Sequence, residues 1–392
     1  MKNRLFLKIE GCSDRMVSLV LLILAIFIRL AYVIYAYSIN IMESFADDKG
    51  YFYLAEEIVH RGKVFYDIDI HLYAEMLGPG LPWLNALTIS IFGVHWLAIF
   101  IVSAIFSSLI IFFIYKTARL FLEKTPSLLA GIWSCFYFFY LDFSATAGKE
   151  IYLSFFFIII LFLLIKIFIK KEYSFVLFFL LSVSYTYSFH LDERLLIFSP
   201  FIFFFILYNE TEFFTKFKFH KSFLFFVLIV LLSVPWTIRN YIQFDKLVLI
   251  STRTEPYTDK LLGYEKKENV IDKYNDIYGF FYIHDYQIDS VIAGLKTKTD
   301  KGYIISEKQR LAMAKGHLPK PLTGIKAFWI RVKDMFRPFQ IGGEFQRTGY
   351  FYYEKSFLHN LVSFLFYGIV FLFSIPGFYF LYKKNKPVFY VF

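Results

Sequence analysis

The hydrophobic positions of this chain fall into long runs that are separated by polar stretches. Crossing a bilayer as a helix takes about 20 mostly apolar residues, and eight runs approach or exceed that length. They cover approximately residues 16–38, 95–115, 126–143, 151–169, 173–190, 194–208, 222–241 and 357–382. The pattern therefore predicts an all-α, polytopic membrane protein with eight spans, of which the sixth is short.

Basic residues mark every second connection between these runs. They are Lys2, Arg4, Lys8, Arg15, Lys116, Arg119, Lys124, Lys166, Lys170, Lys171, Lys216, Lys218, Lys221, Lys383, Lys384 and Lys386. Short loops that are rich in Lys and Arg stay in the cytoplasm. We therefore expect a cytoplasmic N-terminus. The first run is too long for a signal-peptide core and no small-residue cleavage site follows it, so it is interpreted as an uncleaved span.

The remaining connections are external on this topology and carry most of the other polar residues. They cover approximately residues 39–94, 142–150, 190–194 and 242–356. The sequence thus divides into a transmembrane module (1–241), an external loop (242–356) and a C-terminal part (357–392). The chain ends on what looks like the start of a further span, which suggests a C-terminally truncated product because half a span leaves backbone groups unpaired in lipid.

The large external loop is predicted to be mostly helical. Helices are expected near residues 306–315 and 322–336, on either side of a Pro-containing break. We expect the loop to cap a cavity and to influence acceptor choice. The alternative is a solvated loop without substrate contact.

Composition agrees with a membrane location. The chain is 58% hydrophobic and holds 53 Phe and 30 Tyr among 392 residues, which a soluble domain could not accommodate. The net charge of +10 is spread over the connections, so it does not indicate a nucleic-acid surface. The two cysteines, Cys12 and Cys135, lie near and within apolar runs, and we expect no disulfide framework. The Phe, Lys, Ile and Tyr bias favours an AT-rich, bacterial genome.

The first external loop contains two helix signals. In residues 47–62, Asp47 and Asp48 suit a helix start and Gly62 suits its end. Tyr51, Leu54, Ala55 and Ile58 form one apolar stripe, which predicts a helix lying flat on the membrane surface. The aspartates would then be ionised bases at its N-terminus, or they would only cap the helix. Residues 78–93, with Pro82 and Trp83, predict a second interfacial helix or a plain re-entry turn.

Other ionisable residues lie at the external ends of spans. Lys149 and Glu150 open the fourth span, Glu193 and Arg194 open the sixth, and Arg239 closes the seventh. Each could simply snorkel to the interface, but together they offer cations that could hold a phosphate. Arg29 differs because it lies deep in the first span, where a charge costs about 2.5–3.5 kcal/mol, so it should face the bundle or a polar cavity.

A carboxylate base and several external cations suggest transfer from a phosphate-linked donor. The sequence contains no Walker loop and no G-x-G-x-x-G after a strand, so nothing indicates a nucleotide site. A lipid-linked sugar phosphate is a donor that a membrane-embedded external site can reach. Phosphate leaves without prior protonation, so one general base and phosphate-holding cations would suffice for an inverting displacement.

These residues resemble the GT-C superfamily of polyprenyl-phosphate-dependent glycosyltransferases, especially the protein mannosyltransferase-like and aminoarabinose-transferase-like members of the family 39 type. The resemblance rests on four motifs in order and covers approximately residues 16–382. They are the D-[DE]-x-x-Y-x-x-L-A pattern from Asp47 to Gly62, the stretch from Pro79 to Gly93, the Glu150 that ends the second external loop, and P-W-x-x-R-N-Y from Pro235 to Tyr241.

The resemblance implies a GT-C type helical bundle in the inner (plasma) membrane, with its active site external and a lipid or glycan as a candidate acceptor. Asp47 would be the catalytic base, Asp48 would support it or bind a divalent metal where one is used, and Glu150 would line the same site. Donor phosphate binding would fall to Arg194, Arg239 and Lys149. The cavity would include Tyr51, His190, Glu193 and Tyr241. No cofactor is implied with certainty.

Three departures and two alternatives accompany this interpretation. The chain has Asp48 where the family usually has Glu, Leu195 after Arg194 where Pro is common, and no Asn-rich stretch after Ser251-Thr252. An envelope polysaccharide polymerase or ligase would need arginines of the large loop in place of Asp47. A transporter would need ionisable residues near mid-membrane, where only Arg29 qualifies.

Overall fold

The computed structural model describes residues 11–38, 46–66, 77–172, 174–200, 202, 219–245, 247–251 and 369–384. This part of the chain is helical, as expected, and has no strand. The chain divides into two compact units, and nearly all described residues belong to the first, which holds residues 1–40, 47–258 and 378–392. The predicted loop helices near 306–315 and 322–336 and the end of the chain after Lys384 lie outside the described residues.

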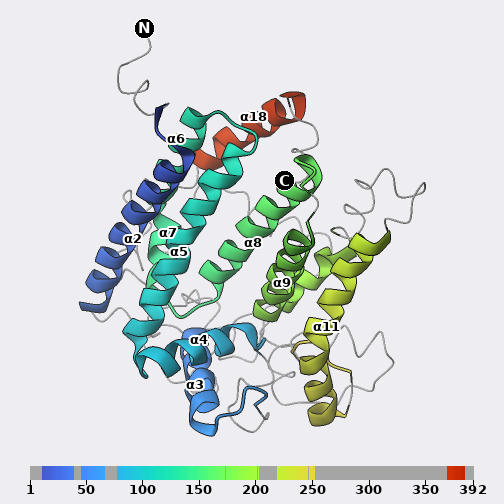
Figure 1. Cartoon of the computed structure of the whole chain (residues 1–392). Coiled ribbons are helices and arrows are strands. Elements are labelled where there is room, and N and C mark those ends of the chain that lie inside the picture. Colours follow the sequence, from blue (N-terminus) through green and yellow to red (C-terminus); the bar gives the residue numbers. More distant parts are fainter. Residues whose placement is uncertain are drawn as a thin grey trace, which may run out of the picture. The chain divides into compact units, whose positions relative to one another are not determined.

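The helices of the first unit follow the predicted runs (Figure 1). Their bounds are α2 (Asp14–Ser38), α3 (Ala46–Arg61), α4 (Gly80–Phe92), α5 (Trp96–Arg119), α6 (Lys124–Cys135), α7 (Phe138–Asp142), η3 (Phe143–Ala145), α8 (Glu150–Leu164), η4 (Ile165–Ile169), α9 (Phe175–Leu191), η5 (Glu193–Phe198) and α11 (Phe219–Phe244). A further helix, α18, covers Ile369–Lys384.

Four of the described helices are long and apolar enough to cross a membrane, or five if the bent pair of α6 with α7–η3 counts as one span. The helix α9 is apolar but shorter, and the sixth predicted span begins as the 3₁₀ helix η5. The rest of that span lies outside the described residues. The multi-pass, all-α class is thereby confirmed for the described part of the chain.

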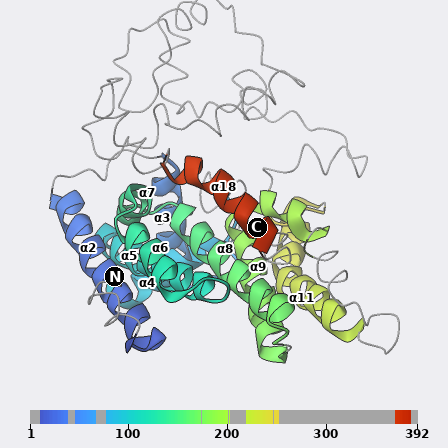
Figure 2. The same ribbon diagram turned by 90° about the horizontal axis from the view of Figure 1, so that it is seen from above.

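The long helices pack side by side in the order α2, α5, α8, α9 and α11, with α6 against α2 and α5 (Figure 2). The core between α2, α5, α6 and α8 is formed by Leu21, Ala25, Ile110, Ile111, Cys135 and Ile151, among others. The opposite helix faces expose large apolar side chains such as Phe27, which is 72% exposed. Exposed apolar faces on both sides of a helical layer are typical of lipid contact.

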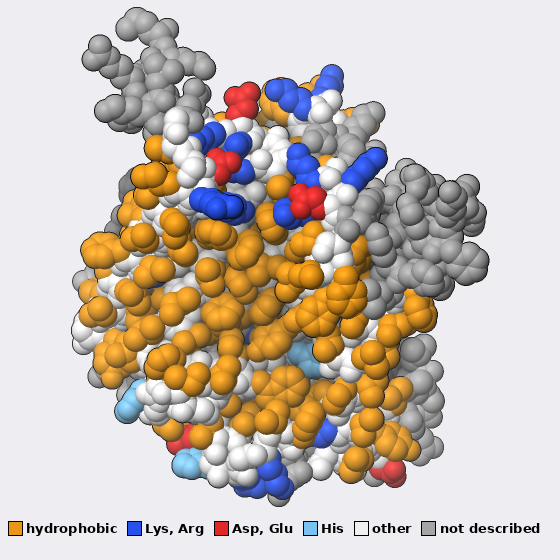
Figure 3. Space-filling view, viewed as in Figure 1, with side chains coloured by type: hydrophobic (Ala, Val, Ile, Leu, Met, Phe, Trp, Pro, Cys, Tyr) orange, Lys and Arg blue, Asp and Glu red, His pale blue; other side chains and the backbone are white. Residues whose placement is uncertain are grey.

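Charged side chains lie at the two ends of the bundle, with an apolar band between them (Figure 3). One end collects the basic residues of the α2 start, the α5 end, the α6 start and the α8–η4 end, including Arg15, Lys116, Arg119, Lys124 and Lys166. The helices α3 and α4 lie at the other end (Figure 1). The basic connections at α2, α5, α6 and α8–η4 therefore share one end, and their placement in the cytoplasm stays a prediction.

The predicted single span 126–143 is wrong as a continuous helix. The helix α6 ends at Cys135, and the following helical segment is bent by 51° relative to it. Arg29, which is fully buried, donates from its guanidinium to the carbonyls of Ser134 and Cys135 at 3.3 and 3.1 Å and to Ser107 Oγ at 2.7 Å. Carbonyls at the end of a helix need partners from outside the helix, and Arg29 provides them here, although the Ser134 carbonyl also accepts from the Tyr137 amide. Arg29 thus faces the bundle, as predicted.

Candidate active site

The candidate site lies at the end of the bundle that carries α3 and α4. Both helices of the first external loop form where the sequence predicts them, and the end of α3 is set by Gly62, whose φ of +63° suits glycine. The apolar stripe of α3 is not laid open to lipid, because Tyr51, Leu54, Ala55 and Ile58 are all buried in the protein. The stripe therefore packs against protein, and the position of α3 at the membrane surface stays a prediction.

Asp48 lies in the first turn of α3 and points its carboxylate at the segment before α8. Its Oδ2 accepts a hydrogen bond from the Ala147 amide at 3.2 Å, and the side chain is only 9% exposed. A Cβ on the next residue, Gly148, would lie 3.1 Å from Asp48 Oδ1 and 2.3 Å from Glu150 Oε2. Both carboxylates thus reach the same glycine, and any larger residue would displace one of them.

A buried serine of α5 and a buried tyrosine of α8 fix the segment that presents the Ala147 amide. Ser103 Oγ donates to the Thr146 carbonyl at 2.9 Å and also pairs with the Tyr152 hydroxyl at 2.9 Å. Ser103 and Tyr152 are fully buried. A non-helical segment in a membrane bundle needs such partners for its backbone groups, and here they also fix the position of the amide that binds Asp48.

Lys149, which follows Gly148, belongs to an ion network with Asp192 and Arg194. Lys149 Nζ lies 2.8 Å from Asp192 Oδ2, and Arg194 Nε lies 2.7 Å from Asp192 Oδ1. Arg194 also pairs with Asp192 through its Nη2. Burial opposes ionisation of Asp192, but the Arg194 hydrogen bond and the Lys149 charge outweigh it and hold the pKa of Asp192 far below its usual value. The predicted cations Lys149 and Arg194 therefore share one carboxylate.

His190 and Glu193 lie on either side of Asp192 along the chain. Glu193 is 4% exposed, and its Oε1 has no hydrogen-bond partner among the described residues. His190 is also buried, with Nδ1 2.8 Å from the Thr186 carbonyl and its ring stacked against Trp83 of α4. Both predicted cavity residues thus belong to this end of α9, and their contact with a substrate stays a prediction.

The start of α4 packs closely on the end of α9 and so fixes the position of His190 and Leu191. A Cβ on Gly78 would lie 2.3 Å from the His190 carbonyl oxygen, and one on Gly80 would lie 2.9 Å from the Leu191 nitrogen. The Tyr187 hydroxyl donates to the Gly80 carbonyl at 2.6 Å. The start of α4 therefore lies backbone to backbone against the end of α9, just before Asp192.

Arg239 has a different environment. Its Nε donates to the Tyr66 carbonyl at 2.8 Å and its Nη1 to Asn240 Oδ1 at 2.8 Å, and the guanidinium lies over the Trp236 ring at 4.6 Å. Arg239 thus fastens the segment after α3 to α11. A role at the donor phosphate stays a prediction, as does a cavity role for Tyr241, which is 55% exposed.

The described residues leave two predictions untested, the role of Asp47 as a base and the metal role of Asp48. Asp47 belongs to the first turn of α3, but its side chain lies outside them. Among the side chains that the structure does describe, no group of three or more His, Cys, Asp or Glu could hold a metal ion. The described side chains therefore give no support for a metal role of Asp48, and that role stays a prediction.

Asp192 was not predicted as a site residue. An isolated Asp at the end of an apolar run gives no motif, and its two cationic partners come from different places in the sequence, Arg194 beside it and Lys149 before α8. Only the antiparallel packing of α8 and α9 brings Lys149 to it. The run of four ionisable residues from His190 to Arg194 was the available signal.

The comparison with protein families supports a membrane glycosyltransferase of the GT-C type, which is the class that the motifs resemble. Residues 77–236 match the family model described as "Dolichyl-phosphate-mannose-protein mannosyltransferase", so this stretch, which is less than half of the chain, is similar to that family. The matched stretch runs from α4 to Trp236 and includes Lys149, Asp192 and Arg194. No curated protein and no solved structure matches the chain.

Proposed function

We propose that the chain transfers a sugar from a polyprenyl-phosphate donor to a lipid, glycan or protein acceptor at the outer face of the membrane, with inversion at the anomeric carbon. The main support is the convergence of Asp48 and Glu150 on Gly148, directly beside the Lys149–Asp192–Arg194 network. Carboxylates and phosphate-binding cations within one short stretch of the bundle end suit this reaction.

In the proposed reaction, Asp47 accepts the proton of the acceptor hydroxyl while that oxygen attacks the anomeric carbon. The bond to the phosphate oxygen breaks, and polyprenyl phosphate leaves with the electron pair. Asp48, held by the Ala147 amide, supports Asp47 in the same helical turn. Lys149 and Arg194 bind the phosphate and stabilise the charge that develops on it.

The test uses the full chain in nanodiscs with a short-chain polyprenyl-phosphate mannose that carries label in the sugar. A membrane extract serves as the acceptor source, and label is followed into lipid, glycan and protein fractions. Asp47→Asn should lower transfer at least about 100-fold, since general bases contribute roughly 10²–10⁴-fold, and Asp48→Asn should also lower it strongly. Insertion and yield should stay as in the wild type.

Glu57→Gln is the matched control. Glu57 lies on the same helix, and its Oε2 pairs with Arg61 Nε at 3.0 Å at the protein surface, so its loss should leave transfer unchanged. Full activity of Asp47→Asn would refute Asp47 as the base. Activity that depends on arginines of the loop 242–356 and not on Asp47 would favour a polysaccharide polymerase or ligase.

A further inference from the structure

The Asp192 carboxylate is the common partner of two cations that approach it from different helices. Lys149 reaches it from the segment before α8, and Arg194 from the first turn of η5. Asp192 also accepts the Arg194 backbone amide at 3.2 Å, so it is the N-cap of η5. One side chain therefore fixes the distance between the two cationic groups.

Burial within this network is uneven. The side chains of Lys149 and Asp192 are 10% and 7% exposed, whereas that of Arg194 is 66% exposed. The Arg194 side chain is thus the exposed member of the network, and Asp192 and Lys149 are its buried members. An anion that approaches from outside meets Arg194 first.

The charges around Lys149 show why Asp192 is needed. Lys149 follows Gly148, to which the carboxylates of Asp48 and Glu150 both extend. A lysine in that position can pair with either of them, and such pairing would withdraw the cation from the phosphate and reduce the basicity of the carboxylates. The contact with Asp192 at 2.8 Å holds Lys149 in another direction.

We propose that Asp192 is the positioning residue of the donor phosphate site, holding Lys149 and Arg194 at a fixed spacing and keeping Lys149 away from Asp48 and Glu150. This inference rests on the proposed function. Asp192 does not touch the reacting atoms. With one negative and two positive charges, the network keeps a net charge of +1, which matches a singly charged phosphodiester.

The test measures KM for the polyprenyl-phosphate mannose and kcat separately. Asp192→Asn should raise KM about tenfold, equivalent to about 1.4 kcal/mol, with a smaller change in kcat. Arg194→Gln should give a similar rise in KM, and because this side chain is largely exposed, the variant should fold even if Asp192→Asn does not. A purely structural role would reduce the amount of active protein and leave KM unchanged.

The double variant Lys149→Met/Asp192→Asn sharpens the test. If Asp192 acts through Lys149, the rise in KM for the double variant should be smaller than the product of the two single effects. Asp14→Asn, at the other end of the bundle, is the control and should leave KM unchanged. Wild-type KM in Asp192→Asn and Arg194→Gln, alongside inactive Asp47→Asn, would overturn this inference alone, whereas full activity of Asp47→Asn would overturn the proposed base.

Discussion

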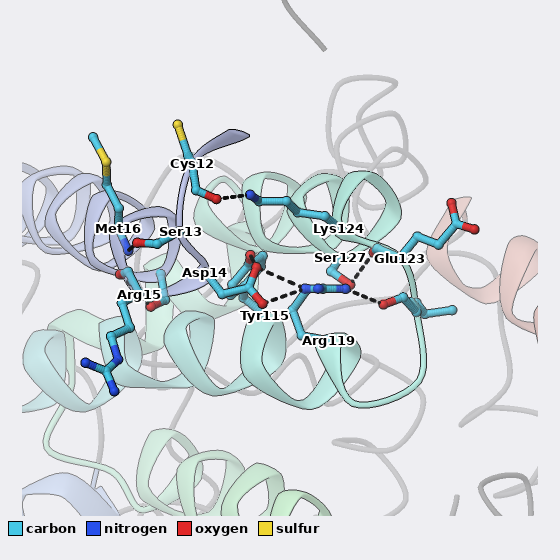
Figure 4. Close-up of polar contacts among 12 residues, drawn as sticks. Cys12, Ser13, Asp14, Arg15, Met16, Tyr115, Arg119, Glu123, Lys124 and Ser127 are labelled. Carbon is cyan, nitrogen blue, oxygen red and sulfur yellow. Dashed lines mark hydrogen bonds and ion pairs between the residues drawn. The ribbon is translucent and has the colours of Figure 1, made fainter. Parts of the chain in front are cut away.

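Each end of the bundle carries a carboxylate that is bound by an arginine, but the two settings differ. At the basic end, Asp14 accepts from Arg119 Nε at 3.2 Å and from the Tyr115 hydroxyl at 3.0 Å, beside an open groove that Lys124 also lines (Figure 4). The side chains of Arg119 and Asp14 are 26% and 42% exposed. At the other end, Lys149 and Asp192 are nearly buried.

The difference in burial bears on what each ion pair contributes to stability. An exposed pair is screened by water and typically contributes 0–1 kcal/mol. A buried pair pays a large desolvation cost and often contributes no more to stability than apolar residues of the same size. The Asp14–Arg119 pair ties the start of α2 to the end of α5 at little cost. The burial of the Lys149–Asp192 pair next to two carboxylates supports the proposed role in binding an anion.

Removal of Lys149 should have the largest effect on stability. In Lys149→Met, Asp192 loses one of its two cationic partners while it stays buried, and the free energy of unfolding should fall by about 3 kcal/mol. Thermal unfolding in detergent measures this change. If the free energy of unfolding falls by less than about 0.5 kcal/mol, Arg194 alone is enough to stabilise the buried Asp192 carboxylate.

The glycine between the carboxylates gives the next prediction. In Gly148→Ala the new methyl would meet Glu150 Oε2 at 2.3 Å and Asp48 Oδ1 at 3.1 Å, and a displacement of about 1 Å in a catalytic group can lower the rate about 100-fold. Gly11→Ala, at the basic end, is the control because nothing lies within 4 Å of its new Cβ. Transfer assays on both variants compare the two ends directly, and equal activity would contradict the site.

The exposed pair should respond weakly. Arg119→Met removes the guanidinium from Asp14 but leaves that carboxylate in contact with water, so we expect a loss of about 0.5 kcal/mol. The same unfolding assay, repeated at high salt, should bring the difference close to zero because salt screens surface charges. A loss as large as that of Lys149→Met would erase the distinction between the two ends.

The smallest expected effect is that of pH on Asp192. The pKa of Asp192 is lowered in the folded state, so its contribution to stability is fully present above the unfolded pKa of about 3.9 and is lost as pH falls towards the folded pKa. The difference in unfolding free energy between the wild type and Asp192→Asn should therefore stay constant from about pH 5 to 8. A difference that changes within this interval would mean that Asp192 titrates there.

Much of the fold could be predicted from the sequence because lipid imposes a simple pattern. Four of the predicted spans, the two helices of the loop 39–94 and the inward position of Arg29 followed from hydrophobic runs, helix end signals and the cost of a buried charge. The break after Cys135 could not be predicted, since Phe136 and Tyr137 give no helix-breaking signal. Arg29, a residue of another helix, donates to the carbonyls at this helix end, and that contact appears only in the tertiary structure.

The candidate site was only partly predictable for the same reason. Lys149, Glu150 and Arg194 stood out because they gather at the same predicted ends of spans, and Asp48 because it lies at the start of the helix predicted over 47–62. Their arrangement depends on how α8 and α9 pack, which brings Lys149 to Asp192. Arg239 also stood out, but sequence could not reveal that its Nε donates to the Tyr66 carbonyl. Residue types were therefore predictable, whereas their partners required the tertiary structure.

The contact of Gly78 and Gly80 with the end of α9 has a consequence for how such a chain can diverge. A methyl group at either position would push the main chain of His190 and Leu191 outward, and Asp192 would move with it. Homologues that accept a side chain there would have to shift this carboxylate relative to α8. Gly78 and Gly80 thus help to fix the position of the Lys149–Asp192 contact, although neither glycine takes part in it.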